Sequence, residues 1–214
     1  MSKERTHLDE RCVLCYTVRD SAAFGRQNGD IEKMKLLIAS DIHGDASAAQ
    51  RLVEIFRQGG FDKLLLLGDI LYHGPRNDLP AAYDPKAVIA CLSPLSDRIL
   101  AVRGNCESEV DQMVLPFPVM ADYALLSLDG LTVFATHGHH HNMTTPPPLS
   151  RGDILLHGHT HVYADIPFGD GNRYLNPGSP SLPKEHKERT YLTYEGRVFR
   201  LMTLDGEVLH ETVL

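Results

Sequence analysis

The chain has 214 residues, a formal net charge of −7, and 43% hydrophobic residues. This length suffices for one globular domain with a continuous core. No apolar run approaches the roughly 18 residues that cross a bilayer, so we expect no membrane-spanning role. The acidic balance gives no general attraction to a polyanion, so we expect a small substrate and no extended nucleic-acid surface.

The first 33 residues differ from the rest of the chain. They are polar, weakly patterned, and end in the turn-like stretch Gln27–Asp30. We predict that residues 1–33 form an N-terminal extension outside the core, either disordered or preceding Met34 as the working initiator. Residues 34–214 are predicted to form the folded domain.

Within this extension, the run from Cys12 to Val18 is apolar but short. Acidic Asp9 and Glu10 precede it, which disfavours a secretory signal. Cys12 and Cys15 lack a second close pair that would complete a four-cysteine zinc site. We therefore predict free thiols and a cytoplasmic location.

From Lys35 onward, buried strands alternate with helices. The runs Lys35–Ser40, Lys63–Leu67 and Arg98–Val102 are apolar, as is typical of buried strands. The stretches Ala46–Gln58 and Asp84–Leu92 carry apolar residues at near-helical spacing. This alternation predicts an α/β domain.

The second half of the chain is predicted to be mainly β. Short apolar or alternating runs are separated by turns such as Asp129-Gly130. The predicted strands are Tyr123–Leu128, Leu131–Thr136, Asp153–His157, Arg189–Tyr194 and Arg197–Leu201.

Five polar clusters directly follow buried runs of the chain. They are Asp41-Ile42-His43-Gly44, Gly68-Asp69, Gly104-Asn105-Cys106-Glu107, His137-Gly138-His139 and Gly158-His159-Thr160-His161. In an α/β sheet the loops beyond the carboxyl ends of the strands converge on one crevice. The pairs Asp41/His43 and His159/His161 are predicted to alternate along extended segments, so that both members face one side. Mixed oxygen and nitrogen donors predict a site for divalent transition-metal ions rather than calcium or magnesium.

In this order, the clusters resemble those of the calcineurin-like metallophosphoesterase family, over nearly all of residues 34–214. Further strings are most similar to the small bacterial YfcE-type phosphodiesterases; they are His73-Gly74-Pro75-Arg76-Asn77, Gly104-Asn105-Cys106 and Asn176-Pro177-Gly178-Ser179. The resemblance implies that residues 34–214 are a metallophosphoesterase domain, folded as a four-layer α/β-β/α sandwich. It also implies two divalent ions, for which we favour Mn²⁺ over Ni²⁺, Fe²⁺ or Zn²⁺.

The resemblance assigns ligands residue by residue. One ion would be held by Asp41, His43 and His161, the other by Asn105, His137 and His159, and both by Asp69. A shared carboxylate reduces the repulsion between two cations about 4 Å apart, and the ions lower the pKa of bound water. The implied reaction is attack of a metal-bound hydroxide on a small phosphodiester.

Other residues of these strings are predicted to act on the substrate. Catalytic roles fall to Asp69, Asn105 and Cys106, and substrate contacts to His73, Arg76, Asn77 and Arg103. Many relatives carry a histidine where this chain has Cys106, so we expect leaving groups of low pKa to be favoured. Arginine suits bidentate contact with phosphate, although Arg103 could instead pack beneath the sheet or pair with Glu107. The role of Glu107 is left open, and residues 139–141 are not counted as ligands.

Two alternatives stand beside a diesterase. The same site could act on phosphomonoesters or nucleotides, or the chain could be a non-catalytic scaffold like the retromer subunit that resembles this fold. The complete ligand set disfavours the scaffold. The sequence lacks a G-x-S-x-G elbow, a Walker loop and a dinucleotide fingerprint, which disfavours other enzyme classes. A homo-oligomer is compatible with the sequence.

Overall fold

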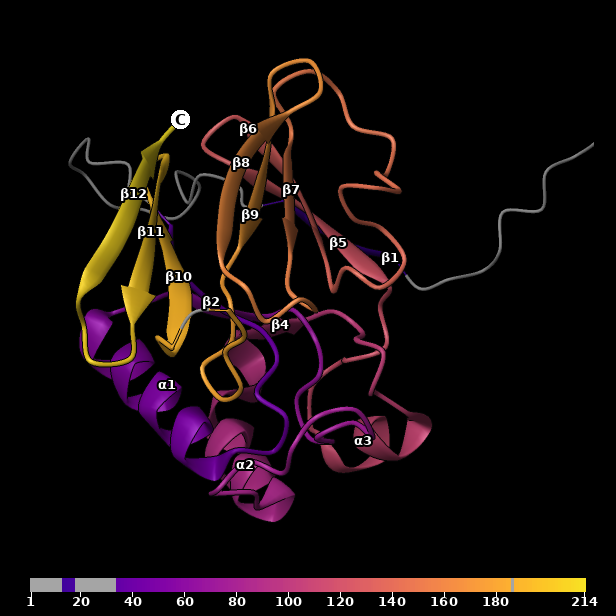
Figure 1. The fold of residues 1–214 in the computed structure, drawn as a ribbon, viewed down its shortest axis with the longest axis vertical. Helices are drawn as coiled ribbons and strands as arrows, with labels where there is room; N and C mark the ends of the chain where they lie inside the picture. Colours follow the sequence, from indigo (N-terminus) through magenta and orange to yellow (C-terminus); the bar gives the residue numbers. More distant parts are fainter. Residues whose placement is uncertain (1–12, 18–33, 186) are drawn as a thin grey trace, which may run out of the picture.

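The structure is a computed structural model that describes residues 13–17, 34–185 and 187–214; for residues 13–17 it describes the backbone. Two six-stranded sheets pack face to face (Figure 1). Helices α1 (Ala46–Gly59) and α2 (Pro85–Leu92) cover the outer face of the sheet that contains the C-terminal strands, which is called the second sheet below. The predicted α/β architecture is confirmed. Among the described residues, no helix has the length and apolar character that crossing a bilayer requires.

The first sheet joins early and middle parts of the chain. Its strand order is β1 (Val13–Thr17), β5 (Tyr123–Leu128), β6 (Leu131–Thr136), β7 (Ile154–His157), β9 (Asn172–Asn176) and β8 (Ala164–Phe168). The order of the second sheet is β12 (Val208–Val213), β11 (Val198–Thr203), β10 (Thr190–Glu195), β2 (Lys35–Ala39), β3 (Lys63–Leu66) and β4 (Ile99–Ala101). The helices are α1 (Ala46–Gly59), α2 (Pro85–Leu92), the 3₁₀ helix η1 (Ser93–Arg98) and α3 (Glu109–Val114).

Each sheet has a parallel centre. Strands β2, β3 and β4 are mutually parallel in one sheet, and β6, β7 and β9 in the other. The carboxyl ends of parallel strands lie at one edge of a sheet, and loops at that edge carry binding residues. Both sheets therefore present a row of such loops.

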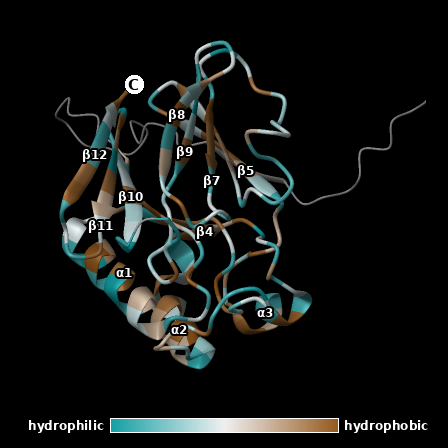
Figure 2. Cartoon of the chain, viewed as in Figure 1, coloured by the Kyte–Doolittle hydropathy of each residue, from teal (hydrophilic) through white to brown (hydrophobic). Residues whose placement is uncertain are grey.

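Apolar side chains form two main layers of core. On β2, Leu36 and Ile38 point between the two sheets, whereas Leu37 and Ala39 point toward the helices. Both faces of this strand are buried, which explains why its sequence is continuously apolar. Figure 2 shows the matching hydropathy, with β7 hydrophobic along its length and α1 hydrophobic on part of its surface. Phe56 of α1 contributes to the helix-facing layer.

The outer face of the first sheet is covered differently. Phe134, Leu155 and Tyr174 pack there against Met143 and Leu149. Both belong to residues 138–152, which contain neither helix nor strand. Three consecutive prolines at 146–148 are incompatible with a helix interior. Among the described residues, the cover of this face is therefore an irregular segment.

Several strands differ from the sequence prediction. Val13–Thr17, assigned to the extension outside the core, form β1 and pair in parallel with β5. The other residues of 1–33 lie outside the described part, so the boundary at Met34 stays a prediction. Strands β8 and β12 were not predicted because both are edge strands with mostly polar or exposed residues, and β8 contains Pro167.

Candidate metal centre and substrate cavity

The seven predicted ligands all lie just beyond parallel strands. Asp41 and His43 follow β2, Asp69 follows β3, Asn105 follows β4, His137 follows β6, and His159 and His161 follow β7. The set is largely buried, since Asp41, His43 and His137 are each 0% exposed. The two sheets therefore deliver their loops to one shared cluster.

The backbone of the two ligand pairs corrects the sequence prediction. Asp41 and His43 have φ angles of 58° and 51°, and His159 and His161 have 67° and 60°, so neither pair is extended. Left-handed conformations are uncommon for residues with a β-carbon and cluster at functional sites. Both members of each pair still reach one centre, but each pair does so through a tight loop. The loop that carries Asp41 and His43 is held by the backbone after β3, since the His43 amide donates to the Asp69 carbonyl at 2.9 Å.

Backbone carbonyls fix the orientation of three histidines. The Nδ1 atoms of His43, His137 and His161 each lie 2.7 Å from a carbonyl oxygen, of Tyr72, Leu67 and Leu182 respectively. A carbonyl only accepts hydrogen bonds, so Nδ1 carries the hydrogen. The Nε2 atom of each neutral ring is then left with a lone pair, as in metal-binding histidines.

These lone pairs point at one another. His43 Nε2 lies 3.1 Å from His161 Nε2. His137 Nε2 lies 3.1 Å from His159 Nδ1 and 3.1 Å from Asn105 Oδ1. Acceptors at such distances repel unless a proton or a metal cation lies between them. The arrangement therefore favours bound cations.

Two carboxylates complete the centre. Asp41 Oδ1 is buried without a hydrogen-bond partner, 3.3 Å from His161 Nε2 and 3.7 Å from His43 Nε2. Asp69 Oδ2 lies between the two histidine groups, 3.6 Å from His43 Nε2 and 3.5 Å from His137 Nε2. An unpaired buried carboxylate oxygen is costly, and a cation beside it removes that cost. The donor set therefore fits divalent metal ions.

Metal ions compete with protons at this centre. Burial raises the pKa of Asp41, but the adjacent His161 and His43 hold it well below its usual value. Burial lowers the pKa of His43, and the adjacent Asp41 carboxylate outweighs this, so that pKa is raised. These shifts favour a positive charge between the carboxylate and the histidines, which a divalent cation would supply.

Glu107 connects the loops that follow β3 and β4. Its buried carboxylate accepts hydrogen bonds from the backbone amides of Asp69 at 2.9 Å, Ile70 at 2.7 Å and Gly104 at 2.5 Å. Burial, followed by the charge of Asp69, raises the pKa of Glu107 to about 7. Gly104 permits this close approach, because a β-carbon there would lie 2.1 Å from Asp69 Oδ1. Glu107 thus positions Asp69, a function that its place in the sequence left open.

The turn Asn176–Ser179 supports the centre from beneath. Ser179 Oγ donates to the Asp41 carbonyl at 2.8 Å, and Asn176 Nδ2 donates to the Gly158 carbonyl at 3.0 Å. Both residues are fully buried. They stabilise the loops after β2 and β7, as expected for a supporting turn.

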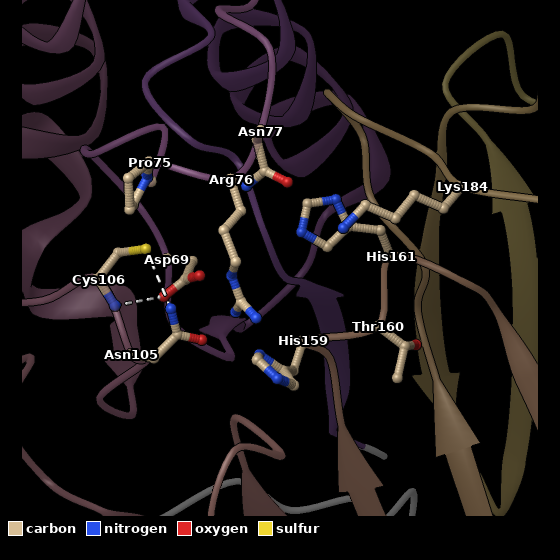
Figure 3. A pocket seen from close by; sticks show the side chains of 11 residues that line it. Asp69, Pro75, Arg76, Asn77, Asn105, Cys106, His159, Thr160, His161 and Lys184 are labelled. Atoms are coloured by element: carbon tan, nitrogen blue, oxygen red, sulfur yellow. Dashed lines mark hydrogen bonds between the residues drawn. The ribbon is translucent and has the colours of Figure 1, made fainter.

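A cavity of about 320 Å³ opens beside the candidate centre (Figure 3). Asp69, Asn105 and His159 contribute to its wall, with Arg76 and Asn77 from the predicted substrate contacts. Figure 3 shows the Arg76 side chain extending across the cavity toward Asn105 and His159. The cavity therefore places an arginine opposite the candidate metal ligands.

The other two predicted substrate contacts do not line this cavity. The His73 ring packs against the rings of Tyr72 and Tyr83, with centroids 4.8 and 5.3 Å away. Arg103 Nη2 lies 3.5 Å from the Glu107 carbonyl oxygen. His73 packs within its own loop, and Arg103 contacts the backbone of Glu107.

Cys106 also lies on the cavity wall. Its amide donates to Asp69 Oδ1 at 2.9 Å, and its sulfur accepts from Asn105 Nδ2 at 3.2 Å. Burial and the adjacent Asp69 carboxylate raise the pKa of the thiol, which keeps it protonated. The thiol thus faces the space where substrate would lie.

Sequence reasoning missed two residues near the centre. Lys184 lines the cavity, but it lies far along the chain from any cluster and outside any strand. His157 is buried at the end of β7, stacked on Tyr174 with ring centroids 4.3 Å apart. Burial lowers the pKa of His157 to about 4, so the ring is neutral. His157 is the last residue of β7, and its place at the end of an apolar run could have marked it as a candidate. No local sequence pattern marked Lys184.

Comparison with known proteins matches this chain to a phosphoesterase family and to two phosphodiesterases. Residues 34–197 match the family model of the calcineurin-like phosphoesterase superfamily domain. The chain is 41% identical over 174 residues to phosphodiesterase YfcE of Escherichia coli strain K12, covering 81% of this chain and 94% of that protein. It is 25% identical over 155 residues to phosphodiesterase MJ0936 of Methanocaldococcus jannaschii, covering 68% and 83%.

Solved structures agree in fold. The structure of YfcE, a phosphoesterase from E. coli, superposes with a TM-score of 0.81 at 40% identity, covering 84% of this chain and 99% of that one. A Vps29 double mutant from Entamoeba histolytica superposes with a TM-score of 0.55 at 17% identity, covering 84% and 98%, and shows likeness of fold alone.

The chain belongs to the calcineurin-like phosphoesterase superfamily and is a metal-dependent phosphoesterase. Within the superfamily it is most similar in kind to the YfcE-type subgroup, as the sequence motifs predicted.

Proposed function

We propose that this protein hydrolyses a small phosphodiester with two divalent ions, of which Mn²⁺ is the preferred one. The observation that carries the proposal is the convergence of unprotonated histidine nitrogens on the unpaired Asp41 Oδ1. The names of the phosphodiesterases YfcE and MJ0936 support a diester as the substrate class.

The geometry supports a division of ligands between two ions. Asp41, His43 and His161 offer ligand atoms within 4.8 Å of one another, which suits one ion. Asn105 Oδ1, His137 Nε2 and His159 Nδ1 form a second close group. Asp69 Oδ2 lies within 3.6 Å of a nitrogen from each group, which suits a bridging ligand. When bound, such ions supply Lewis acidity that makes hydroxide available at neutral pH and neutralises phosphoryl charge.

The protein's own side chains bind and orient the substrate. The Arg76 guanidinium extends over the cavity, where it can donate two parallel hydrogen bonds to phosphoryl oxygens. Glu107 and the Cys106 amide hold the Asp69 carboxylate in one orientation. Cys106 offers only a thiol of raised pKa where many relatives have histidine, so it is a poor proton donor to a leaving group. Esters with leaving groups of low pKa should therefore react fastest.

The decisive experiment couples metal analysis to hydrolysis of bis(p-nitrophenyl) phosphate. We expect two ions per wild-type chain and a loss of about 10³-fold in kcat/KM for Asp69→Asn, since the bridging charge is removed. Asp170→Asn, which changes an exposed carboxylate paired with Arg151, is the matched control and should remain active. In the wild type, kcat/KM should fall as the pKa of the leaving phenol rises, and a flat dependence would count against the role given to Cys106.

Three outcomes would change the assignment. Full activity of Asp69→Asn would refute the bridging role. Faster turnover of p-nitrophenyl phosphate than of the bis-aryl diester would move the assignment to a phosphomonoesterase. If a chelator changed neither the rate of hydrolysis nor the thermal stability, the result would favour the non-catalytic scaffold.

A further inference from the structure

Two cationic side chains face the cavity without a carboxylate partner. Arg76 and Lys184 both line it, and neither forms an ion pair with any residue in the described part of the chain. Figure 3 shows Lys184 extending toward His161, with Arg76 between it and Asn105. This chain carries a net charge of −7, so unpaired cations gathered at one cavity call for an anionic ligand.

Basic side chains elsewhere in the molecule are often neutralised. Arg189 pairs with Asp45 at 3.2 Å, and Arg200 pairs with Glu211 at 2.7 Å. Within the described part of the chain, Arg76 and Lys184 form no such ion pair. The acidic residue of the cavity wall is Asp69, whose carboxylate already faces His43 and His137.

The backbone ties Lys184 to the candidate centre. Its amide donates to the His161 carbonyl at 3.1 Å, and the His161 ring bonds to the Leu182 carbonyl at 2.7 Å. The segment that carries the lysine is therefore held against a proposed metal ligand. The backbone of Lys184 therefore lies at a fixed place relative to the candidate centre.

One diester phosphate does not use all of this charge. Two divalent ions carry four positive charges, and Asp41 and Asp69 carry two negative ones, so the centre alone attracts the single charge of a diester. Arg76 already contacts the phosphoryl oxygens in the proposed function, so the charge of Lys184 remains unused by the diester. The cavity of about 320 Å³ is small for a ligand site, and among the described residues of its wall histidine is the one aromatic type on which a base could stack.

We propose that the natural substrate is a compact phosphodiester bearing a second anionic group, a phosphate or a carboxylate, and that Lys184 binds this group with Arg76 beside it. The proposal rests on the diesterase function proposed above. Lys184 is a specificity-determining residue: it selects among diesters by charge and takes no part in the hydrolysis itself.

The test compares diesters that share one leaving group. p-Nitrophenyl 3-carboxyphenyl phosphate and its 3-carbamoylphenyl counterpart have similar size and differ by one charge, and a 3-phosphonophenyl ester adds a doubly charged probe. The corresponding 4-substituted esters place the charged group at a different distance from the scissile phosphate. We expect the wild type to prefer the better-placed anionic ester over the amide by about tenfold in kcat/KM. This preference is at the low end of the effect of a charge-assisted hydrogen bond, because Lys184 is exposed to solvent. A larger preference for the phosphonate would identify phosphate as the natural group, and a larger one for the carboxylate would identify a carboxylate.

Matched variants separate this inference from the diesterase function. Lys184→Met should bring the anion-to-amide ratio to near one, because the ratio isolates the effect of the added charge from any change in overall activity. Lys86→Met removes an exposed charge from α2, outside the cavity wall, and should keep the wild-type ratio. An unchanged ratio in Lys184→Met, or a wild-type ratio near one for every isomer, would overturn the inference. Failure of the wild type to cleave the uncharged bis-aryl diester would instead overturn the diesterase function.

Discussion

In the described part of the chain, two clusters combine a carboxylate with histidine, and they are built in opposite ways. Asp165 on β8 accepts from Arg173 Nε and Thr212 Oγ1, and its Oδ2 lies 2.8 Å from His210 Nε2. Thr212 and His210 belong to β12, so this cluster joins the outer strands of the two sheets. Every charge in it has a partner within the protein.

The candidate metal centre leaves several of its polar atoms without such partners. Asp41 Oδ1 is buried without a donor, and the nitrogens of His43 and His161 face each other at 3.1 Å. Burial costs free energy for polar atoms without partners, so a protein retains them where a ligand supplies the partner. The contrast teaches that the Asp165 cluster serves stability and that the Asp41 cluster serves binding.

The largest effect is expected for Asp41→Asn. Loss of this charge should lower kcat/KM by about 10³-fold and remove most of the stabilisation by metal. At about 1,000 times the dissociation constant, Mn²⁺ should stabilise the wild type by about 4 kcal/mol, which thermal unfolding with and without Mn²⁺ would measure. Asp165→Asn should keep this gain. If Asp41→Asn also kept it, the distinction between the two clusters would fail.

An intermediate effect is expected for Glu107→Gln. The amide nitrogen of glutamine would face at least one of three backbone donors, so we expect a loss of about 1–3 kcal/mol in the free energy of unfolding. Activity should fall by about tenfold through misplacement of Asp69. Urea unfolding and kcat/KM would measure both. Glu54→Gln, an exposed change in a pair with Arg51, should stay within about 0.5 kcal/mol of wild type, and equal stability of the two variants would refute the role of Glu107.

The smallest effect is expected for Asp165→Asn. Burial raises the pKa of Asp165, but Arg173, Thr212 and His210 lower it overall below its ordinary value of 3.8. A lowered pKa gives stability that is present above pH 3.8 and is lost as the pH falls through the folded-state value. The variant should therefore be about 1 kcal/mol less stable at pH 7, with unchanged activity, and the gap should close below that lower pKa. Urea unfolding at pH 7 and at pH 2–3 would show it, and a gap independent of pH would contradict the assigned cause.

The candidate ligands were predictable because their signal is local. A buried apolar run followed by a polar residue marks the end of a strand, and the strands β2, β3, β4, β6 and β7 all carry this mark. Parallel strand ends lie at one edge of a sheet, which brings together the candidate ligands within each sheet. The meeting of the two edges was implied by the family resemblance and depends on how the sheets pack. The left-handed backbone at Asp41 and His43 was not predicted, because an alternating pattern predicts only which side a residue faces.

Edge strands and loops gave no comparable signal. Strand β12 exposes most of its residues, so no apolar run revealed it. Residues 138–152 cover the outer face of the first sheet as an irregular segment, where the resemblance implied a helical layer. Such elements are decided by what they pack against, which the chain order alone does not specify.

By itself, the sequence determined the fold class, the strand ends that carry the seven candidate ligands, and the phosphoesterase family. Only the tertiary structure decided that Glu107 supports Asp69, that His73 packs away from the cavity, and that Lys184 faces it beside Arg76. The physical reason is range: strand periodicity and turn chemistry act over a few residues. Contacts between loops far apart in the chain depend instead on how two complete sheets pack together.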